Sequence, residues 1–456
     1  MAAIKRALLI CTAVSLLCIG IQNDAAGEPP ATREDELIGR ATRFVELLRS
    51  GEYQEAVADF DETMKSVSPP GKLEETWKAL IAQVGPLKRR TGVRQEPWKQ
   101  YELVFVTCEF ERALLDIKVV FDPEGRIAGM WFQPAQQAGD YDPPGYSEPD
   151  LFNEREVTVG SGEWALPGTL TLPDGKGPFP AVVLVHGSGP QDRDETIGPN
   201  KPFRDIAEGL SSRGIAVLRY EKRTKEHATR CAAMRNRLTV KEETVDDALA
   251  AVELLRRTQP IDGDRIFVLG HSLGGMVVPR IGGRDPRIAG FIIMAGANRP
   301  MEDMILEQTR YISGLDGTIS DEEQEHITAL ERQVARVKAA DLSPDTPADE
   351  LPFGIHARYW LDLRGFEPAK AAASLARPIM ILHGERDYQV TAADLRGWKR
   401  ALADRKDVTV KSYRKLNHLF IEGNGASGPS EYQQPGHVAT EVIEDITRWI
   451  GGIHAR

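Results

Sequence analysis

Cysteine is scarce in this chain, which has only four in 456 residues. Cys11 and Cys18 lie in an N-terminal segment described below, and Cys108 and Cys231 are far apart in the sequence. This usage excludes a disulfide framework and a cysteine-rich metal site. The chain also lacks an HExxH pair and a glycine-rich nucleotide loop after a strand, so we expect no metal and no cofactor.

An excess of basic residues is missing as well. Lys and Arg number 57 against 68 Asp and Glu, which gives a net charge of -11 without any basic cluster. Such a chain is poorly suited to phosphate backbones and to anionic membrane surfaces. We therefore expect no nucleic acid partner. The hydrophobic share of 41% and the charged share of 27% are typical of a soluble globular protein, and the length suits two domains.

The apolar run over residues 7–20 is too short for a comfortable transmembrane helix. It follows Lys5 and Arg6 and precedes the small residues Ala25-Ala26-Gly27. This order predicts a secretory signal peptide over residues 1–27, export to a periplasm or to the outside, and no stable membrane insertion once the signal is removed. A retained anchor is the alternative.

Residues 32–134 predict a small α+β domain. Apolar residues recur at helical spacing over 34–49, 53–60 and 73–84, and after Gly92 they follow a strand pattern. The predicted strands are 101–110, 113–121 and 127–132. No catalytic residue types are grouped here, so we interpret this part as an accessory or substrate-shaping domain. A linker rich in proline and glycine, residues 135–150, follows it.

From residue 151 to residue 456, short apolar strands alternate with helices after a leading hairpin. This pattern predicts an α/β fold with a mostly parallel sheet covered on both faces. The alternation breaks over residues 297–376, where Ser320-Asp-Glu-Glu323 forms a capping-box motif before an amphipathic helix. Since this insertion follows a strand, we predict a helical cap over the site; an ordinary solvated helical excursion is the alternative.

The second domain is organised around Ser272. The apolar segment 266–269 predicts a buried strand, and Gly270-His271-Ser272-Leu273-Gly274 after it matches G-x-S-x-G. A serine exposed on a sharp turn between strand and helix needs neighbours without a Cβ at both glycine positions. The helix that follows directs its N-terminal N–H groups toward the serine. We therefore predict that Ser272 is a nucleophile.

A serine hydroxyl needs a base to take its proton, and the base needs a third group to orient it. Asp387, just past a predicted strand, is the candidate acid, and Glu385 is its competitor. His418, in the loop after the last predicted strand, is the candidate base, and His437 is the alternative. We expect His271 to point away from Ser272. We assign no catalytic role to three histidines at or near strand ends: His186, His271 and His383.

An oxyanion hole requires two backbone N–H groups. Leu273, the residue after the nucleophile, supplies one. The other comes from the glycine-rich loop His186-Gly187-Ser188-Gly189, with Ser188 as the first choice and Gly189 as the alternative. The charged run over residues 219–223 also follows a strand. It could flank the mouth of a pocket, but we favour a solvated loop with one structural ion pair.

Four motifs occur in the order found in the α/β-hydrolase superfamily, and the chain from about residue 153 onward resembles it: His186-Gly-Ser-Gly-Pro190, Gly270-His-Ser-Leu-Gly274, Gly384-Glu-Arg-Asp387 and Asn417-His418. The run over residues 186–194 is similar to that of bacterial secreted or periplasmic esterases, which are related to dienelactone hydrolases and to the peptidase domain of prolyl oligopeptidases. Members often carry an N-terminal domain of unknown function, which residues 32–134 resemble.

The resemblance implies a carboxylesterase that cleaves short acyl esters of small molecules, with Ser272, Asp387 and His418 as its triad. One departure is Glu221-Lys-Arg-Thr224, where the group has Asp-Lys-Arg-Gly. Three other functions are considered. A peptidase of the prolyl-oligopeptidase type is disfavoured because the chain lacks a region long enough for a β-propeller. A non-catalytic binding protein would not need the whole triad. An acyltransferase would use an acceptor other than water. The oligomeric state cannot be read from the sequence.

Overall fold

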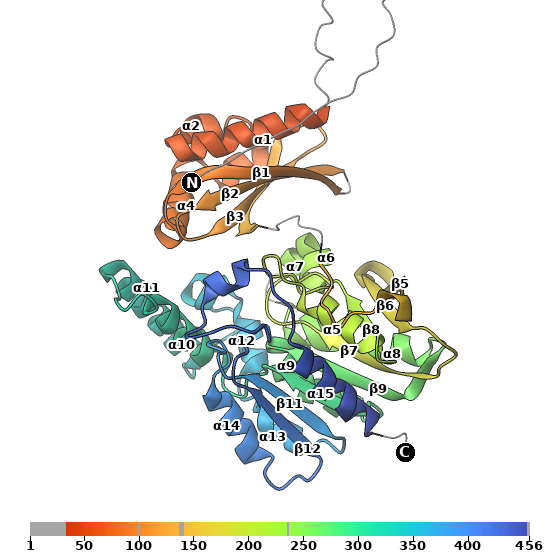
Figure 1. Cartoon of the computed structure of the whole chain (residues 1–456). Coiled ribbons are helices and arrows are strands. Elements are labelled where there is room, and N and C mark those ends of the chain that lie inside the picture. The colour runs from red at the N-terminus through yellow and green to blue at the C-terminus, as the bar shows by residue number, and fades with distance from the viewer. Residues whose placement is uncertain (1–32, 99, 136–140, 235–236, 454–456) are drawn as a thin grey trace, which may run out of the picture. The chain divides into compact units, whose positions relative to one another are not determined.

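The computed structural model describes residues 33–98, 100–135, 141–234 and 237–453 (Figure 1). The chain divides into two compact units, one of residues up to 108 together with 117–132, the other of residues 109–116 together with 133–456. The predicted signal peptide lies outside the described residues. Within the described ranges, no helix has the length and apolar character required to cross a bilayer.

The first unit contains helices packed on a four-stranded sheet, and α1 lies across one face of that sheet (Figure 1). The strands neighbour one another in chain order. The helices are α1 (Arg33–Ser50), α2 (Tyr53–Ala56), α3 (Glu62–Val67) and α4 (Pro70–Val84), and the strands are β1 (Leu87–Trp98), β2 (Tyr101–Phe110), β3 (Leu114–Phe121) and β4 (Ile127–Pro134). The apolar face predicted for the first helix is buried at Leu37, Ala41, Phe44, Val45 and Leu48.

Two features of this unit differ from the sequence prediction. The single helix expected over 53–60 is wrong, because α2 ends at Ala56 and Phe60 forms a β-bridge with Ile127. The chain then starts α3 at Glu62, where the Asp61 side chain accepts a hydrogen bond from the N–H of Met64 at 2.7 Å. Strand β1 was also missed, since most of its side chains are exposed and give no apolar alternation.

The second unit is built on an eight-stranded sheet. Its strands are β5 (Phe152–Val159), β6 (Leu166–Pro173), β7 (Phe179–Val185), β8 (Ala216–Tyr220), β9 (Ile261–His271), β10 (Gly290–Met294), β11 (Ile379–Gly384) and β12 (Val408–Tyr413). Their order is β12-β11-β10-β9-β7-β8-β6-β5. The run from β12 to β8 is parallel, and the predicted hairpin β5–β6 joins it antiparallel through β6. The sheet is therefore mostly parallel, as predicted.

Helices cover both faces of this sheet because successive side chains of its central strands point to opposite sides. On β7, Val183 and Val185 join the core under one set of helices, while Val182 and Leu184 join the core under the other. The first set includes α8 (Asp246–Arg256), which follows a π-helical turn (Lys241–Val245), α9 (Leu273–Arg284), α13 (Pro368–Ala373) and α14 (Ala392–Ala401); the second includes α5 (Pro202–Ser211) and α15 (Thr440–Gly451).

A helical insertion separates β10 from its parallel neighbour β11, within the predicted range 297–376. It contains α10 (Met301–Ser313), α11 (Asp321–Lys338) and α12 (Ala357–Leu363), followed by α13. Helix α11 begins with the predicted capping box, in which Ser320 and Glu323 bond to each other's backbone N–H groups. Its buried side chains, Ile327, Leu330, Val334 and Val337, are those of the predicted apolar face. Three of them pack with Trp360 of α12 in a small core of the insertion.

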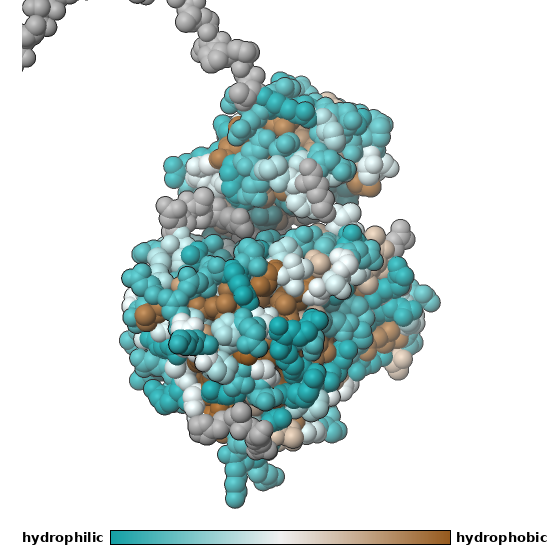
Figure 2. All heavy atoms as spheres, turned by 90° about the vertical axis from the view of Figure 1, so that its right-hand side faces the viewer, coloured by the Kyte–Doolittle hydropathy of each residue, from teal (hydrophilic) through white to brown (hydrophobic). Residues whose placement is uncertain are grey.

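Polar residues dominate the face of the molecule drawn in Figure 2, where apolar residues form separate patches.

The segment expected to be a linker makes specific contacts where it is described. Tyr141 donates a hydrogen bond to Asp205 of α5 at 2.8 Å, and the hydroxyl of buried Tyr146 donates to the carbonyl of Val438 at 2.7 Å. Residues 141–146 therefore pack on the α5 and α15 side of the second unit.

Candidate active site

Ser272 lies on a strained turn between β9 and α9. Its φ of 53° and ψ of -116° are rare for a residue with a side chain. A Cβ on Gly270 would come within 2.3 Å of the Gly274 carbonyl oxygen, and one on Gly274 within 2.2 Å of the Val185 carbonyl oxygen. Both glycines of the motif are thus required by close backbone contacts. The turn presents Ser272 at the N-terminus of α9, where backbone N–H groups lack helical partners.

The structure brings Asp387 and His418 together, although 31 residues separate them. Nδ1 of His418 lies 2.7 Å from Oδ2 of Asp387, and both residues are buried. The other oxygen of Asp387 accepts hydrogen bonds from the N–H groups of Gln389 and Val390 at 2.8 and 2.9 Å. A carboxylate held on one side in this way orients the imidazole and favours the tautomer that leaves Nε2 free to accept a proton.

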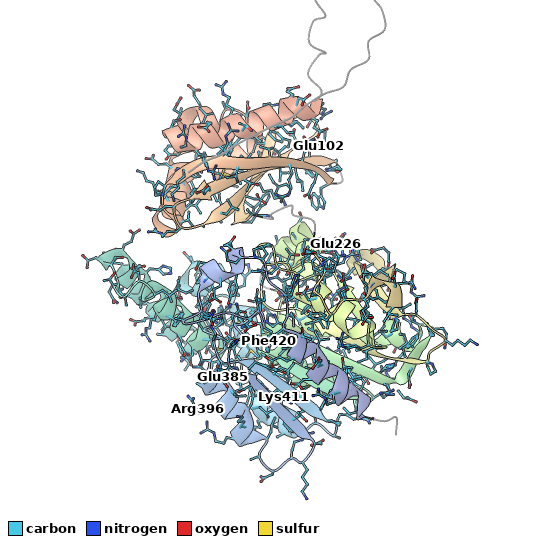
Figure 3. All side chains as sticks on the ribbon, in the orientation of Figure 1. Glu102, Glu226, Glu385, Arg396, Lys411 and Phe420 are labelled. Carbon is cyan, nitrogen blue, oxygen red and sulfur yellow. The ribbon has the colours of Figure 1, made fainter. Side chains whose placement is uncertain are left out.

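The loop that carries His418 is itself firmly placed. The side chain of Asn417 accepts hydrogen bonds from the N–H groups of Leu419 and Ile421. Phe420, labelled in Figure 3, is fully buried with a φ of 59°. A Cβ on Gly384 at the end of β11 would lie 2.5 Å from the carbonyl oxygen of Leu416. The base loop therefore packs directly against the strand end that precedes Asp387.

The competing residues have other partners. Glu385, labelled in Figure 3, is exposed and accepts a hydrogen bond from the Ser412 hydroxyl at 2.6 Å. His437 pairs with Asp205 at 3.1 Å, and this hydrogen bond raises the pKa of its imidazole. The structure therefore associates Asp387, not Glu385, with His418, and it places His437 beside Asp205 of α5.

The loop after β7 approaches Ser272 closely. A Cβ added to Gly187 would lie 3.2 Å from the Cβ of Ser272. Ser188, next in the chain, is exposed, and within the described residues its N–H has no hydrogen-bond acceptor. Leu273 is the first residue of α9. The two segments from which an oxyanion hole is predicted, the loop after β7 and the start of α9, thus both adjoin Ser272.

A family model described as serine aminopeptidase, S33, matches residues 178–423, which is more than half of the chain. That range contains the turn at Ser272, the loop after β7, Asp387 and His418. The chain belongs to this serine aminopeptidase S33 family of α/β-hydrolases. A second model, for a protein family of unknown function, DUF3887, matches residues 41–130 of the first unit.

One relative is long enough to extend over both units. Esterase EstD of Thermotoga maritima is 39% identical over 407 residues, which cover 89% of this chain and 93% of the esterase. A monoacylglycerol lipase of Mycolicibacterium smegmatis is 28% identical over 60% of this chain and 88% of the lipase. Among solved structures, Est1E from Butyrivibrio proteoclasticus matches 65% of this chain and 99% of its own, with 16% identity and a TM-score of 0.41.

In this S33 hydrolase a pocket of about 410 Å³ opens beside the loop after β7. Ser188, Gly189 and Pro190 form one wall, and α7 (Ala228–Met234) contributes Ala228, Cys231 and Ala232 to another. The helical insertion supplies Met301, Ile355, His356 and Tyr359. The insertion therefore helps to enclose the space next to the site, as a cap would. Apart from Glu243, whose carboxylate is paired, and His356, the wall is largely apolar or small.

Sequence reasoning missed a buried acid, Glu195, behind this site. Oε1 of Glu195 accepts the N–H of Gly187 at 2.6 Å, and Oε2 lies 2.9 Å from Nδ1 of His271. Nε2 of His271 is 3.0 Å from the carbonyl oxygen of His418. Burial, the largest single effect, lowers the pKa of His271, but the interactions with Glu195, with the His418 carbonyl and with the charge of Asp387 together outweigh it and leave that pKa raised. A lone acid in a polar loop gives no signal in the sequence that it will be buried.

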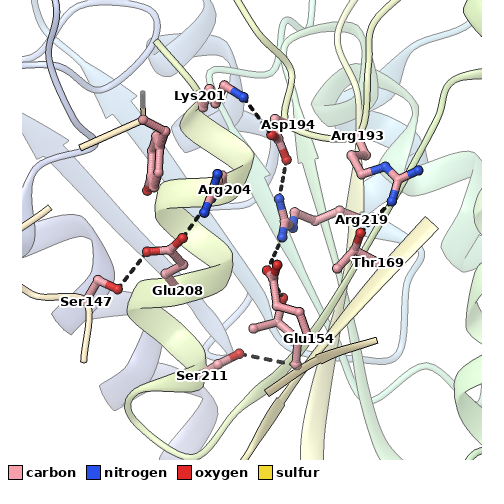
Figure 4. A network of polar contacts seen from close by, with 12 residues as sticks. Ser147, Glu154, Thr169, Arg193, Asp194, Lys201, Arg204, Glu208, Ser211 and Arg219 are labelled. Atoms are coloured by element: carbon pink, nitrogen blue, oxygen red, sulfur yellow. Dashed lines mark hydrogen bonds and ion pairs between the residues drawn. The ribbon is translucent and has the colours of Figure 1, made fainter. Parts of the chain in front are cut away.

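The interpretation of residues 219–223 as a solvated loop is wrong. Arg219 is buried and makes ion pairs with Asp194 and Glu154, as Figure 4 shows. Lys222 is only 2% exposed. Its Nζ donates to the carbonyl oxygen of Gly187 at 2.6 Å. The run therefore supports the loop after β7 through Lys222. Arg219 can be buried because it pairs with acids that lie far away in the sequence.

Proposed function

We propose that this protein is a carboxylic ester hydrolase that uses Ser272, His418 and Asp387 as a catalytic triad and forms an acyl-enzyme. The observation that carries the proposal is the buried contact of 2.7 Å between His418 and Asp387, on the same sheet edge as the strained Ser272. The identity of 39% to a named esterase, over most of both chains, supports the choice of esters.

In this mechanism the Oγ of Ser272 attacks the ester carbonyl carbon while Nε2 of His418 takes its proton. The N–H groups of Leu273 and Ser188 receive the negative charge that develops on the carbonyl oxygen. The tetrahedral intermediate then expels the alcohol, which receives the proton from His418. Water, activated by the same histidine, attacks the acyl-enzyme and releases the carboxylic acid together with free Ser272. Asp387 orients the imidazole and stabilises its cation throughout.

We further propose that the acyl groups are short and that the protein is exported. The pocket beside Ser188 has a limited volume and largely apolar or small walls, which suits a short acyl chain. The order of charged, apolar and small residues over 1–27 supports export, with secretion or a periplasmic location as the result.

The test is hydrolysis of p-nitrophenyl acetate and butyrate by the purified protein and its Ser272→Ala variant. We expect activity in the first and a loss of about 10⁴-fold or more in the second. Equal activity in both would overturn the triad. No activity in either, with a fluorophosphonate still labelling Ser272, would retain the nucleophile and exclude these esters.

A peptidase is the second candidate, because the matched family model is described as a serine aminopeptidase. Aminoacyl p-nitroanilides discriminate the two functions, since the same triad must then protonate an amine instead of an alcohol. Turnover of anilides that exceeds turnover of esters at equal concentration would favour the peptidase. Labelling of the wild-type protein but no turnover of either substrate would point to an unusual acyl group or to an acceptor other than water.

A further inference from the structure

The peptide unit between Gly187 and Ser188 is held from its carbonyl side. Nζ of Lys222 donates to the Gly187 oxygen at 2.6 Å, and the lysine side chain is 2% exposed. This unit also contains the N–H of Ser188, the second donor of the proposed oxyanion hole. The peptide bond is trans, so its C=O and N–H point in opposite directions. A group that fixes the carbonyl oxygen therefore also fixes the direction of the Ser188 N–H.

The neighbouring peptide unit is held as well. Glu195 accepts the N–H of Gly187 at 2.6 Å, so Gly187 has a charged partner on each side. A glycine would otherwise allow this loop to rotate freely. In addition, a cation on the carbonyl oxygen polarises the peptide and strengthens its N–H as a donor. Both effects serve a donor that must point at the oxyanion before the reaction begins.

Lys222 is in turn held by a chain of contacts that ends in the helical insertion. Its Nζ lies 2.8 Å from Oε1 of Glu243, and Oε2 of Glu243 accepts the hydroxyl of Tyr359 at 2.8 Å. Glu243 belongs to the π-helical turn before α8, and Tyr359 belongs to α12. Both residues line the same pocket as Ser188. The three side chains thus connect a wall of this pocket to the loop after β7.

From this arrangement we infer that Lys222 is a positioning residue that aims the Ser188 N–H at the oxyanion, and that Glu243 and Tyr359 hold Lys222 in place. The inference rests on the proposed function. A buried lysine and glutamate are costly to desolvate and contribute little net stability as a pair. Their position between the pocket and the oxyanion loop gives them a role in the rate of the reaction.

Removing Lys222 alone would leave the Glu243 carboxylate buried without a cation and could unfold the protein. The test therefore uses the double variant Lys222→Met/Glu243→Gln, which removes both charges and keeps an acceptor for Tyr359. We expect kcat to fall about 10-fold to 100-fold, somewhat less than the loss of a complete oxyanion donor, with KM nearly unchanged. The affinity for a trifluoromethyl ketone, whose adduct carries an oxyanion, should fall by the same factor. Near-UV circular dichroism checks the fold.

The matched control is Lys225→Met on α6 (Arg223–Glu226). Lys225 is exposed and pairs only with Glu221, at 3.0 Å, among the described contacts. The Lys225→Met variant should retain full activity. A folded double variant with the wild-type kcat would overturn the inference. So would a lower kcat without any loss of affinity for the trifluoromethyl ketone, because that result would indicate a structural role alone.

A second readout separates this inference from the proposed function. A fluorophosphonate labels a serine nucleophile through an intermediate that also places an oxygen in the oxyanion hole. If the wild-type protein is labelled but does not hydrolyse esters, the proposed substrate class fails. Slower labelling of the double variant than of Lys225→Met would still support the role of Lys222, whereas equal labelling rates would overturn it.

Discussion

Glu195 and His271 form a buried ion pair directly behind the nucleophile, with Oε2 of the acid 2.9 Å from Nδ1 of the imidazole. Nε2 of His271 faces a second acceptor, the carbonyl oxygen of His418. Nε2 of His271 is close enough for a hydrogen bond, whereas Nδ1 and Oε2 of Glu195 are linked by their opposite charges without a well-aligned hydrogen bond. Glu195 also holds Gly187, so one buried acid connects the oxyanion loop to the loop of the catalytic base.

The Glu195→Gln variant should lose stability in a way that depends on pH. In the wild-type protein the pKa of His271 is raised above 6.5. The pKa of Glu195 is lowered from 4.5, because its interactions with His271, with His186 and with the N–H of Gly187 together outweigh burial. A raised histidine pKa stabilises the fold below pH 6.5, and this contribution is lost as the pH rises through the folded-state value. A lowered glutamate pKa stabilises above pH 4.5, and that contribution is lost as the pH falls.

The two windows overlap at about pH 5.5, where the variant should lose roughly 3 kcal/mol in the free energy of unfolding. The deficit should be smaller at pH 9, where a smaller fraction of His271 is charged. Urea denaturation at the two pH values measures it. Glu226→Gln, on α6 (Figure 3), is the control and should show a small change at both pH values. An equal deficit at pH 5.5 and pH 9 would contradict a stabilising charge on His271 that is lost as the pH rises over this range.

The choice between the two acids near β11 can be tested by a matched pair of variants. Asp387→Asn keeps the shape of the side chain but no longer favours the tautomer of His418 that can accept a proton. We expect kcat for p-nitrophenyl butyrate to fall about 10⁴-fold. Glu385→Gln removes a carboxylate two residues away that contacts Ser412, and it should leave kcat within about twofold of the wild type. The reverse ranking would assign the acid to Glu385.

Two glycines of α9 provide a test of the close backbone packing at the turn that carries Ser272. A Cβ on Gly274 would meet two backbone carbonyl oxygens, of Val185 at 2.2 Å and of His186 at 2.7 Å. Backbone cannot move aside as a flexible side chain can, so Gly274→Ala should lose about 3 kcal/mol of stability and most of its activity. Gly283 near the end of the helix has open space around its Cα. Gly283→Ala should therefore be neutral or up to about 1 kcal/mol more stable in thermal unfolding.

Local patterns predicted much of the fold. Strands over residues 101–110 and 408–413 have the predicted bounds, and the capping box at Ser320 starts α11 as expected. These features depend on residues that are near in sequence and on apolar faces that repeat with a fixed period. Strand β1 was not predicted because its side chains are mostly exposed and show no such period.

The polar support of the site could not be predicted in the same way. Arg219 pairs with Glu154, 65 residues earlier, and Tyr359 reaches Glu243, 116 residues earlier. A charged residue in a sequence is most often solvated. Only the assembled sheet shows that Arg219 and Lys222 are buried and that Glu195 lies beside His271. The triad candidates were accessible from sequence because they follow strand ends, whereas the residues that hold their loops follow no such rule.

The pocket beside Ser188 leads to a prediction about acyl length. Ala228 on α7 lines this pocket and is exposed, so its Cβ can be extended without disturbing a core. In Ala228→Phe the ring would occupy part of the space of about 410 Å³. If the acyl chain binds there, kcat/KM for p-nitrophenyl hexanoate should fall about 10-fold to 100-fold, while the value for the acetate should change less than threefold. Ala233→Phe is the matched control, because Ala233 is exposed on the same helix but does not line the pocket.

Equal losses for both esters in Ala228→Phe would assign the pocket to the alcohol portion or to no part of the substrate. A series of p-nitrophenyl and ethyl esters of the same acids distinguishes these two results, since only an alcohol site would respond to the change of leaving group.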